Sequence, residues 1–352
     1  MFRNGPDHTG ASNDAGISLA NVSTLSRAFA VPDVGSLFIS SPAVANGVVY
    51  EGSTLGVFYA VDASTGAIRW TYSAGPGVYS SPAVVNGIVY FGSGGNVYAL
   101  NASTGAVVWI HNAGVWVSSS PVVADGVIYI GSIDIGNITG TVYALDASTG
   151  AKLWSLTTGG QVGSSPAVAN GIVYVGSGDN KLYALDAATG AALWIYTTGG
   201  RISSSPAVAN GIVYFGSEDD TVYALNATTG VVAWTYAAVA PVTSSPAVAN
   251  GIIYIGAGSG TISGGKLYAL DASTGAVVWI FTTNWAVVSS PAVANGIVYI
   301  GTIDGIMYAL DASTGAVAWS VATAGRIQSS PSVANGTLYF GSNQIEAYRP
   351  SP

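Results

Sequence analysis

Residues 164–194 read SSPAVANGIVYVGSGDNKLYALDAATGAALW, and closely related strings recur along the whole chain. A unit that is about 40 residues long, rich in Val, Ile and Tyr and punctuated by turn residues, predicts the four-stranded blade of a β-propeller. The Ser-Ser-Pro motif that opens each unit has its proline at Pro42, Pro82, Pro121, Pro166, Pro206, Pro246, Pro291 and Pro331. Eight copies of the motif predict an all-β propeller of eight antiparallel blades.

Each unit divides into four expected strands. Residues 164–169 form the inner strand A, where a proline is tolerated because one edge of that strand is unpaired. The dipeptide Asn170-Gly171 favours a tight hairpin into strand B at 172–175, since both residue types accept positive φ. Strand C is expected at 181–185 and strand D at 191–197, with a turn between them.

The two ends of the chain are incomplete repeats that complement each other. The last unit stops after its third strand, at 345–348, and the segment 25–31 falls where a fourth strand is missing. We therefore predict that the N-terminal strand completes the last blade and closes the ring. The expected organisation is a lead segment over 1–24, one propeller domain over 25–349 and a tail over 350–352.

Seven tryptophans occupy one register, each twelve residues before the next Ser-Ser-Pro proline. The constant register favours a packing role between blades over a row of ligand-stacking sites. They are Trp70, Trp109, Trp154, Trp194, Trp234, Trp279 and Trp319.

Composition excludes several classes of function. The formal net charge is −8, which disfavours nucleic acid as a partner because phosphate binding requires a basic patch. The chain has no cysteine, so disulfides and thiolate chemistry are excluded. No apolar run is long enough to span a membrane. We expect the protein to be a monomer.

The strand C to strand D segment carries a more specific signal. Residues 144–154 follow the pattern Ala-x-Asp-x-x-Thr-Gly-x-x-x-Trp, which recurs at 184–194, 269–279 and 309–319, and with Asn for Asp at 99–109 and 224–234. This pattern resembles the tryptophan-docking motif of the PQQ-like propeller repeats, a superfamily that includes quinoprotein alcohol dehydrogenases and BamB-like assembly factors. The resemblance covers about residues 25–349 and implies the eight-bladed fold.

The same resemblance bears on cofactors and location. Enzymes of the superfamily hold PQQ and Ca²⁺ with Glu, Asn and Asp ligands and often a vicinal cysteine pair. This chain lacks cysteines and the long insertions that cover the cofactor, so we expect a non-PQQ-binding member with no cofactor and no metal. The opening residues 1–10 are similar to the lead-in that follows the signal peptide in exported members. We therefore expect an exported protein, periplasmic, cell-surface or extracellular, whose signal peptide is absent from this sequence.

Single residues give little support for catalysis. His8 and His111 lie in no catalytic or metal-binding pattern, and the run 218–220 could contribute oxygens to Ca²⁺ but is better explained as a solvated turn. Five acids lie in the strand C to strand D turns. Eight others are expected at or near the strand B to strand C connections: Glu51, Asp134, Asp179, Glu218, Asp219, Asp220, Asp304 and Glu346.

The repeats differ from one another mainly in two kinds of loop. The A–B and C–D turns are nearly constant and share one face of a propeller, whereas the variable D–A and B–C loops emerge on the opposite face. Two of the B–C loops, at 131–142 and 256–267, are longer than the others. A specific site is expected where the repeat constraint is relaxed. The candidate ligand-binding residues at the channel mouth on this face are Tyr79, Trp116, Gln161, Arg201, Trp285, Arg326 and Gln328.

These observations leave three functional hypotheses. The first is a non-catalytic binding or scaffold propeller that holds a protein or small-molecule ligand on the variable face. The second is a PQQ- and Ca²⁺-dependent oxidoreductase. The third is a carbohydrate-binding propeller, suggested by Tyr79, Trp116 and Trp285.

Overall fold

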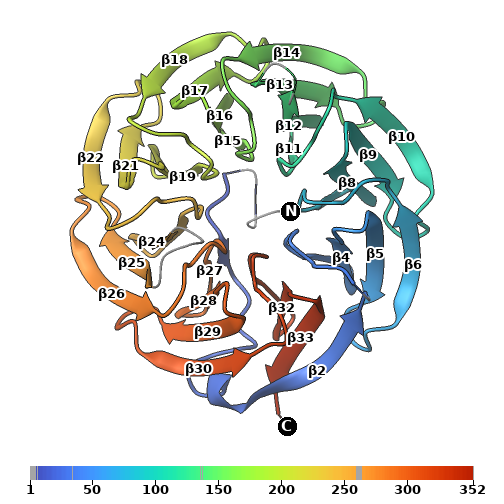
Figure 1. The fold of residues 1–352 in the computed structure, drawn as a ribbon, viewed down its shortest axis with the longest axis vertical. Coiled ribbons are helices and arrows are strands. Elements are labelled where there is room, and N and C mark those ends of the chain that lie inside the picture. Colours follow the sequence, from blue (N-terminus) through green and yellow to red (C-terminus); the bar gives the residue numbers. More distant parts are fainter. Residues whose placement is uncertain are drawn as a thin grey trace.

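The computed structural model describes residues 5, 7–33, 35–134, 136, 138–258 and 264–351. In this part of the chain eight sheets stand around a central channel, and each contains a blade of four antiparallel strands in the order inner to outer (Figure 1). A fifth strand is added in parallel to the inner edge of one blade. The prediction of an all-β, eight-bladed propeller is confirmed. The only helical element in the described ranges is the short 3₁₀ turn η2 (Val22–Thr24), and no described helix could cross a membrane.

Equivalent strands follow one another around the ring from blade 1 to blade 8. The inner A strands are β3 (Ala43–Ala45), β7 (Ala83–Val85), β11 (Val122–Ala124), β15 (Ala167–Ala169), β19 (Ala207–Ala209), β23 (Ala247–Ala249), β27 (Ala292–Ala294) and β31 (Ser332–Ala334). The B strands are β4 (Val48–Gly52), β8 (Ile88–Ser93), β12 (Val127–Asp134), β16 (Ile172–Gly176), β20 (Ile212–Gly216), β24 (Ile252–Ala257), β28 (Ile297–Gly301) and β32 (Thr337–Gly341). The C strands are β5 (Val57–Asp62), β9 (Asn96–Asn101), β13 (Thr139–Asp146), β17 (Lys181–Asp186), β21 (Thr221–Asn226), β25 (Gly265–Asp271), β29 (Ile306–Asp311) and β33 (Gln344–Pro350). The outer D strands are β6 (Ile68–Ser73), β10 (Val107–Asn112), β14 (Lys152–Thr158), β18 (Ala192–Thr197), β22 (Val232–Ala237), β26 (Val277–Thr283), β30 (Val317–Ala322) and β2 (Leu25–Pro32).

The ring closes as predicted. Strand β2 pairs antiparallel with β33, in a register that runs from Leu25 opposite Pro350 to Pro32 opposite Gln344. The eighth blade therefore contains strands from both ends of the chain, and β2 and β33 lie side by side at the rim (Figure 1).

The inner strands are shorter than expected, because the serines that precede them bond across the channel wall. The amide of Ser165 donates to Oγ of Ser205 in the next repeat at 2.9 Å. Equivalent bonds of 2.8–3.1 Å join every repeat to the next, and the amide of Ser330 returns to Oγ of Ser41 at 2.9 Å. These eight bonds form a closed circle around the axis. Strand A accordingly begins after the proline, at Ala167 rather than at 164.

The tryptophans of the repeat join adjacent blades. The indole Nε1 of Trp194 donates to the carbonyl oxygen of Ala227 in the next blade at 3.0 Å, and the hydroxyl of Tyr174 donates to the same oxygen at 2.9 Å. The glycine in the turn between strands C and D lies against the indole ring of the tryptophan in the preceding blade. Gly190 has φ +75°, and a Cβ there would lie 2.6 Å from the Trp154 ring, so only glycine fits. Buried apolar clusters fill each junction between blades, so the core is divided into wedges.

The described part of the lead, from residue 7 onward, lies inside the channel, where Figure 1 shows it crossing the ring in blue before it joins β2. The amides of Val208, Val248 and Val293, on the A strands of blades 5 to 7, donate to its carbonyl oxygens at 2.8, 2.6 and 3.0 Å. Strand β1 (Ala11–Ser12) adds in parallel to β27. Backbone bonds to the inner strand edges therefore hold the lead in place.

Two acids expected near the B–C connections are instead buried within strands. Glu346 accepts hydrogen bonds from Ser342 and Tyr348. Glu51 is fully buried in β4 at the junction of blades 8 and 1, and neither of its carboxyl oxygens has a hydrogen-bond partner among the described residues. Burial raises the pKa of Glu51 well above its usual range, so the side chain is held neutral.

We expect residues 1–31 to be essential for stability. Their deletion removes β2 and leaves one edge of β33 unpaired, so the melting temperature should fall by more than roughly 10 °C. Deletion of residues 1–16 alone is the matched control, because it removes the first part of the lead, including β1, but keeps β2. Thermal unfolding followed by circular dichroism measures both. Equal melting temperatures for the 1–31 deletion and the full chain would contradict the closure.

Glu51 makes the stability of the ring depend on pH. Its folded-state pKa lies above the unfolded value of about 4.3, so the folded state holds the proton more tightly and stability declines as pH rises from about 5. The decline should reach up to about 1.4 kcal/mol per pH unit until the folded-state pKa is passed. Glu51→Phe, which copies Phe91 of blade 2, should remove this decline. Parallel stability curves for the two proteins between pH 5 and 9, measured by urea unfolding, would refute the assignment.

Candidate functional site

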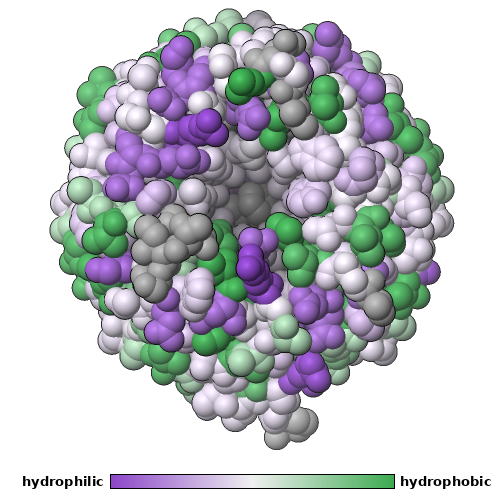
Figure 2. Space-filling view, viewed as in Figure 1, coloured by the Kyte–Doolittle hydropathy of each residue, from purple (hydrophilic) through white to green (hydrophobic). Residues whose placement is uncertain are grey.

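The candidate residues lie on the face that carries the D–A and B–C loops, and the centre of this face is hollowed (Figure 2). Strong hydrogen bonds fix the loops at blades 4 and 5. Asp179 accepts from the amide of Gly159 at 3.0 Å and from the hydroxyl of Tyr183 at 2.6 Å, and Asp219 repeats the arrangement with Gly199 and Tyr223. Burial, and then the nearby Asp179, raise the pKa of Tyr183 above its usual range, so its hydroxyl remains a donor.

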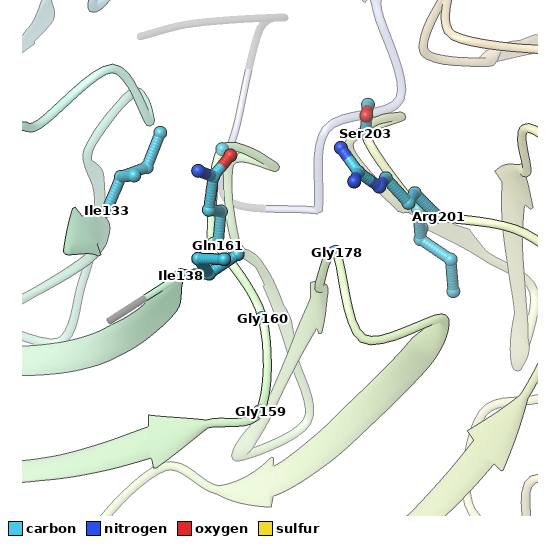
Figure 3. Close-up of a pocket in the computed structure, with 10 residues that line it drawn as sticks. Ile133, Ile138, Gly159, Gly160, Gln161, Gly178, Arg201 and Ser203 are labelled. Carbon is cyan, nitrogen blue, oxygen red and sulfur yellow. The ribbon is translucent and has the colours of Figure 1, made fainter. Parts of the chain in front are cut away.

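Two candidate residues line one cavity. A space of about 160 Å³ is bordered by Gln161 from the loop entering blade 4 and by Arg201 from the loop entering blade 5. Figure 3 shows the polar ends of these two side chains on the same side of the cavity. Ile133 and Ile138, from the end of the β12–β13 hairpin, and Ser203 complete this part of the wall.

Charges around this cavity are only partly balanced. Ser203 Oγ donates to Glu218 at 2.7 Å, and the amide of Glu218 donates to the carbonyl oxygen of Arg201 at 2.9 Å. Within the described part of the chain the one ion pair is Arg69–Asp62, so the exposed guanidinium of Arg201 faces solvent without a carboxylate partner. Arg201 is thus available to an anionic group of a ligand.

The longer B–C connection of blade 3 is mostly strand rather than loop. Strand β12 continues to Asp134 and β13 begins at Thr139, so the additional residues lengthen the hairpin. Backbone bonds in both directions, 3.1 and 2.8 Å long, join Ile133 to Trp116 and fix the position of that tryptophan. The longer connection of blade 6 falls largely on 259–263, outside the described residues.

The aromatic candidates form one pair and one isolated residue. Tyr79 and Trp116 have ring centroids 5.4 Å apart with their planes tilted by 46°. Trp285, on the loop entering blade 7, is 44% exposed, and it lies across the ring from Trp116 because their blades are four positions apart. The structure therefore groups Tyr79 with Trp116 and Gln161 with Arg201.

The two remaining candidates lie together on the loop entering blade 8. Arg326 is exposed and Gln328 is half-buried, while Ile327 between them is fully buried against the neighbouring blade. Neither of them lines the cavity formed by Gln161 and Arg201.

Sequence reasoning missed the apolar side of the cavity. Ile138 is 66% exposed, the largest exposed fraction among the large apolar side chains of the described ranges. The extra length of its hairpin was a signal that blade 3 differs from the others. The shorter hairpins have no residue equivalent to Ile138, so comparison of the repeats could not predict its exposure.

Groups that could support metal or redox chemistry are also sparse in the described ranges. No set of three or more His, Asp or Glu residues there is close enough to hold a metal ion. Glu218 and Asp219 form the hydrogen bonds described above, and Asp220 occupies a turn position at φ +65°. The arrangement can bind a ligand through a cation, an amide and an apolar edge.

Several solved structures share this fold. BamB from Moraxella catarrhalis matches with a TM-score of 0.77 and 19% identity, covering 92% of this chain and 99% of that one. Quinohemoprotein alcohol dehydrogenase from Comamonas testosteroni matches with a TM-score of 0.85 and 18% identity, covering 98% and 80%. The computationally designed Ika8 protein matches with a TM-score of 0.78 and 18% identity, covering 92% and 99%. A search of curated proteins finds no match.

The family is shown by a sequence model. The model described as outer membrane protein assembly factor BamB matches residues 20–136, 138–279 and 237–350, nearly the whole propeller. The chain therefore belongs to the BamB-like family of PQQ-like repeat propellers.

Proposed function

We propose that this protein is a non-catalytic binding propeller that holds a protein partner on its loop face. The observation that carries the proposal is the cavity that places the unpaired guanidinium of Arg201 beside Gln161 and the exposed Ile138. A partner loop with one acidic and one apolar side chain matches these groups. Membership of a family described as an outer membrane protein assembly factor supports a scaffold role and a location in the cell envelope.

A second candidate function is carbohydrate binding. The contact between Tyr79 and Trp116 at the channel mouth provides flat apolar area with polar edges, which suits a sugar ring. The 46° tilt between the rings reduces their shared platform, so the protein partner is favoured. A glycan array separates the two candidates, because a protein-binding site would give no saturable glycan signal.

The binding face is tested with a pair of double variants. Arg201→Ala with Trp116→Ala should reduce partner recovery at least tenfold in cross-linking from an envelope extract, because it removes the cation and the anchored aromatic. The matched control on the opposite face is Asn170→Gly with Asn210→Gly. Glycine is chosen because both asparagines have positive φ, +51° and +52°. Partner loss in the glycine pair with retention in the alanine pair, both folded, would place the site on the other face.

We also predict no quinoprotein activity. The described residues offer no cluster of metal-binding side chains, and the chain has no cysteine. After incubation with PQQ and Ca²⁺, dye-linked oxidation of ethanol should equal the rate of the cofactor alone. Turnover clearly above that blank, together with cofactor retained through gel filtration, would establish the oxidoreductase hypothesis instead.

A further inference from the structure

The junction of blades 8 and 1 contains a second cavity, on the face opposite the proposed partner site. It has a volume of about 280 Å³ and lies among the A–B turns of both blades, the C–D turn of blade 1 and the last residues of β33. The side chains that matter for its chemistry are Asp62, Arg69, Asn335, Thr337, Tyr339 and Arg349.

Both arginines depart from the repeat. Arg349 directly follows the paired residue Tyr348 of β33, at the position where strand C of the other blades ends in Asp or Asn, as at Asp186. Arg69 occupies a position of strand D that is Ala, Val or Leu in the other blades, as at Leu153. Two cations are thus concentrated at a junction whose counterparts around the ring carry acids and aliphatic residues.

One of the two charges is already balanced. Arg69 Nη2 lies 2.7 Å from Asp62 Oδ2. The other carboxylate oxygen of Asp62 accepts from the amide and hydroxyl of Ser64, at 3.0 and 2.6 Å, and from Thr65. Hydrogen bonds from Ser64, and then from Arg69, hold the pKa of Asp62 below its usual range. Asp62 therefore stays ionised and pairs with Arg69, and it forms no ion pair with Arg349.

Arg349 has no ion-pair partner among the described residues. Arg349 Nη2 donates to the carbonyl oxygen of Ser64 at 3.0 Å, and its buried Nε has no acceptor among the described residues. Among the side chains that line the cavity the charged ones are Asp62, Arg69 and Arg349, which leaves one positive charge in the lining. Asp14 lies nearby, where it accepts from the amide of Gly336 at 3.1 Å. A guanidinium that spends one donor on a neutral carbonyl still offers a fork of N–H groups to an anion.

We propose that this cavity is a binding site for a small oxyanion, either a carboxylate or a phosphate. Arg349 would supply the charge and the fork, while Asn335 and Thr337 supply neutral hydrogen-bonding groups along the wall. The cavity is bordered by β33 of blade 8 and by the turns of blade 1, so a bound anion links the two blades at the closing junction. Because the ligand binds the folded ring and not the unfolded chain, it stabilises closure.

The test measures thermal unfolding of the full chain at pH 7 in sodium phosphate, sodium acetate or sodium chloride at matched ionic strength. A saturable rise in melting temperature with phosphate or with acetate, absent in chloride, is expected, and the effective salt identifies which oxyanion the site takes. Arg349→Gln should weaken the response at least tenfold in anion concentration. Lys152→Gln, which removes an exposed cation of β14 that belongs to no proposed site, is the control and should keep the full response.

A second variant, Arg349→Lys, tests the proposal if Arg349→Gln does not fold. Arg349→Lys keeps the charge without the fork and should weaken binding while retaining the structure. Line broadening of the phosphate ³¹P resonance by the wild-type protein needs no variant and should saturate at one site per chain if phosphate is the ligand. Equal shifts in all three salts, or an unchanged response in the Arg349 variants, would overturn the proposal.

Discussion

The hydrogen bond from the amide of one motif serine to the hydroxyl of the next is the interaction on which the ring depends. Each bond requires the inner strands to stand at one distance from the axis, and the circle is complete only when Ser330 reaches Ser41. The residues around this circle of hydrogen bonds are small because eight inner strands meet there. The proline beside each serine has no N–H group and so needs no acceptor. The circle thus accounts for the most uniform part of the sequence.

The same constraint divides the surface into two unequal faces. The A–B and C–D turns must return each strand at a fixed angle, so their residue types are restricted. Asn170 is suited to its turn because it accepts a positive φ, and Asp186 because its carboxylate accepts a hydrogen bond from a backbone amide of the turn. The loops on the other face only need to span the distance between strands, and they hold different side chains in each blade. Specific recognition by a repeat protein is therefore concentrated where the repeat is interrupted, whether by a longer hairpin or by the junction of the two chain ends.

The fold could be predicted almost completely from the sequence, and the sites only in part. Regular spacing of Ser-Ser-Pro and Trp determines blade number, and the missing strand at one end matches the surplus strand at the other. Gln161 and Arg201 could be chosen because loop position alone places them at the channel mouth. The cavity wall formed by Ile138 could not be predicted, because it depends on how far the β12–β13 hairpin extends. The burial of Glu51 could not be predicted either, because it depends on which side of β4 faces the neighbouring blade. The substitution of Glu51 for the apolar residue found in other blades was visible as a departure from the repeat, but its effect needed the packing around it.

The shared eighth blade also has a consequence for how the protein is made. Strand β2 ends at Pro32 and its partner β33 begins at Gln344, so the ribosome must add about 310 residues between them. At about 5–20 residues per second, this takes roughly 15–60 s. During that time seven blades can assemble in order, each on the one before, while β2 waits with an unpaired edge. The eighth blade can therefore form only after all the residues of the seven other blades have been synthesised.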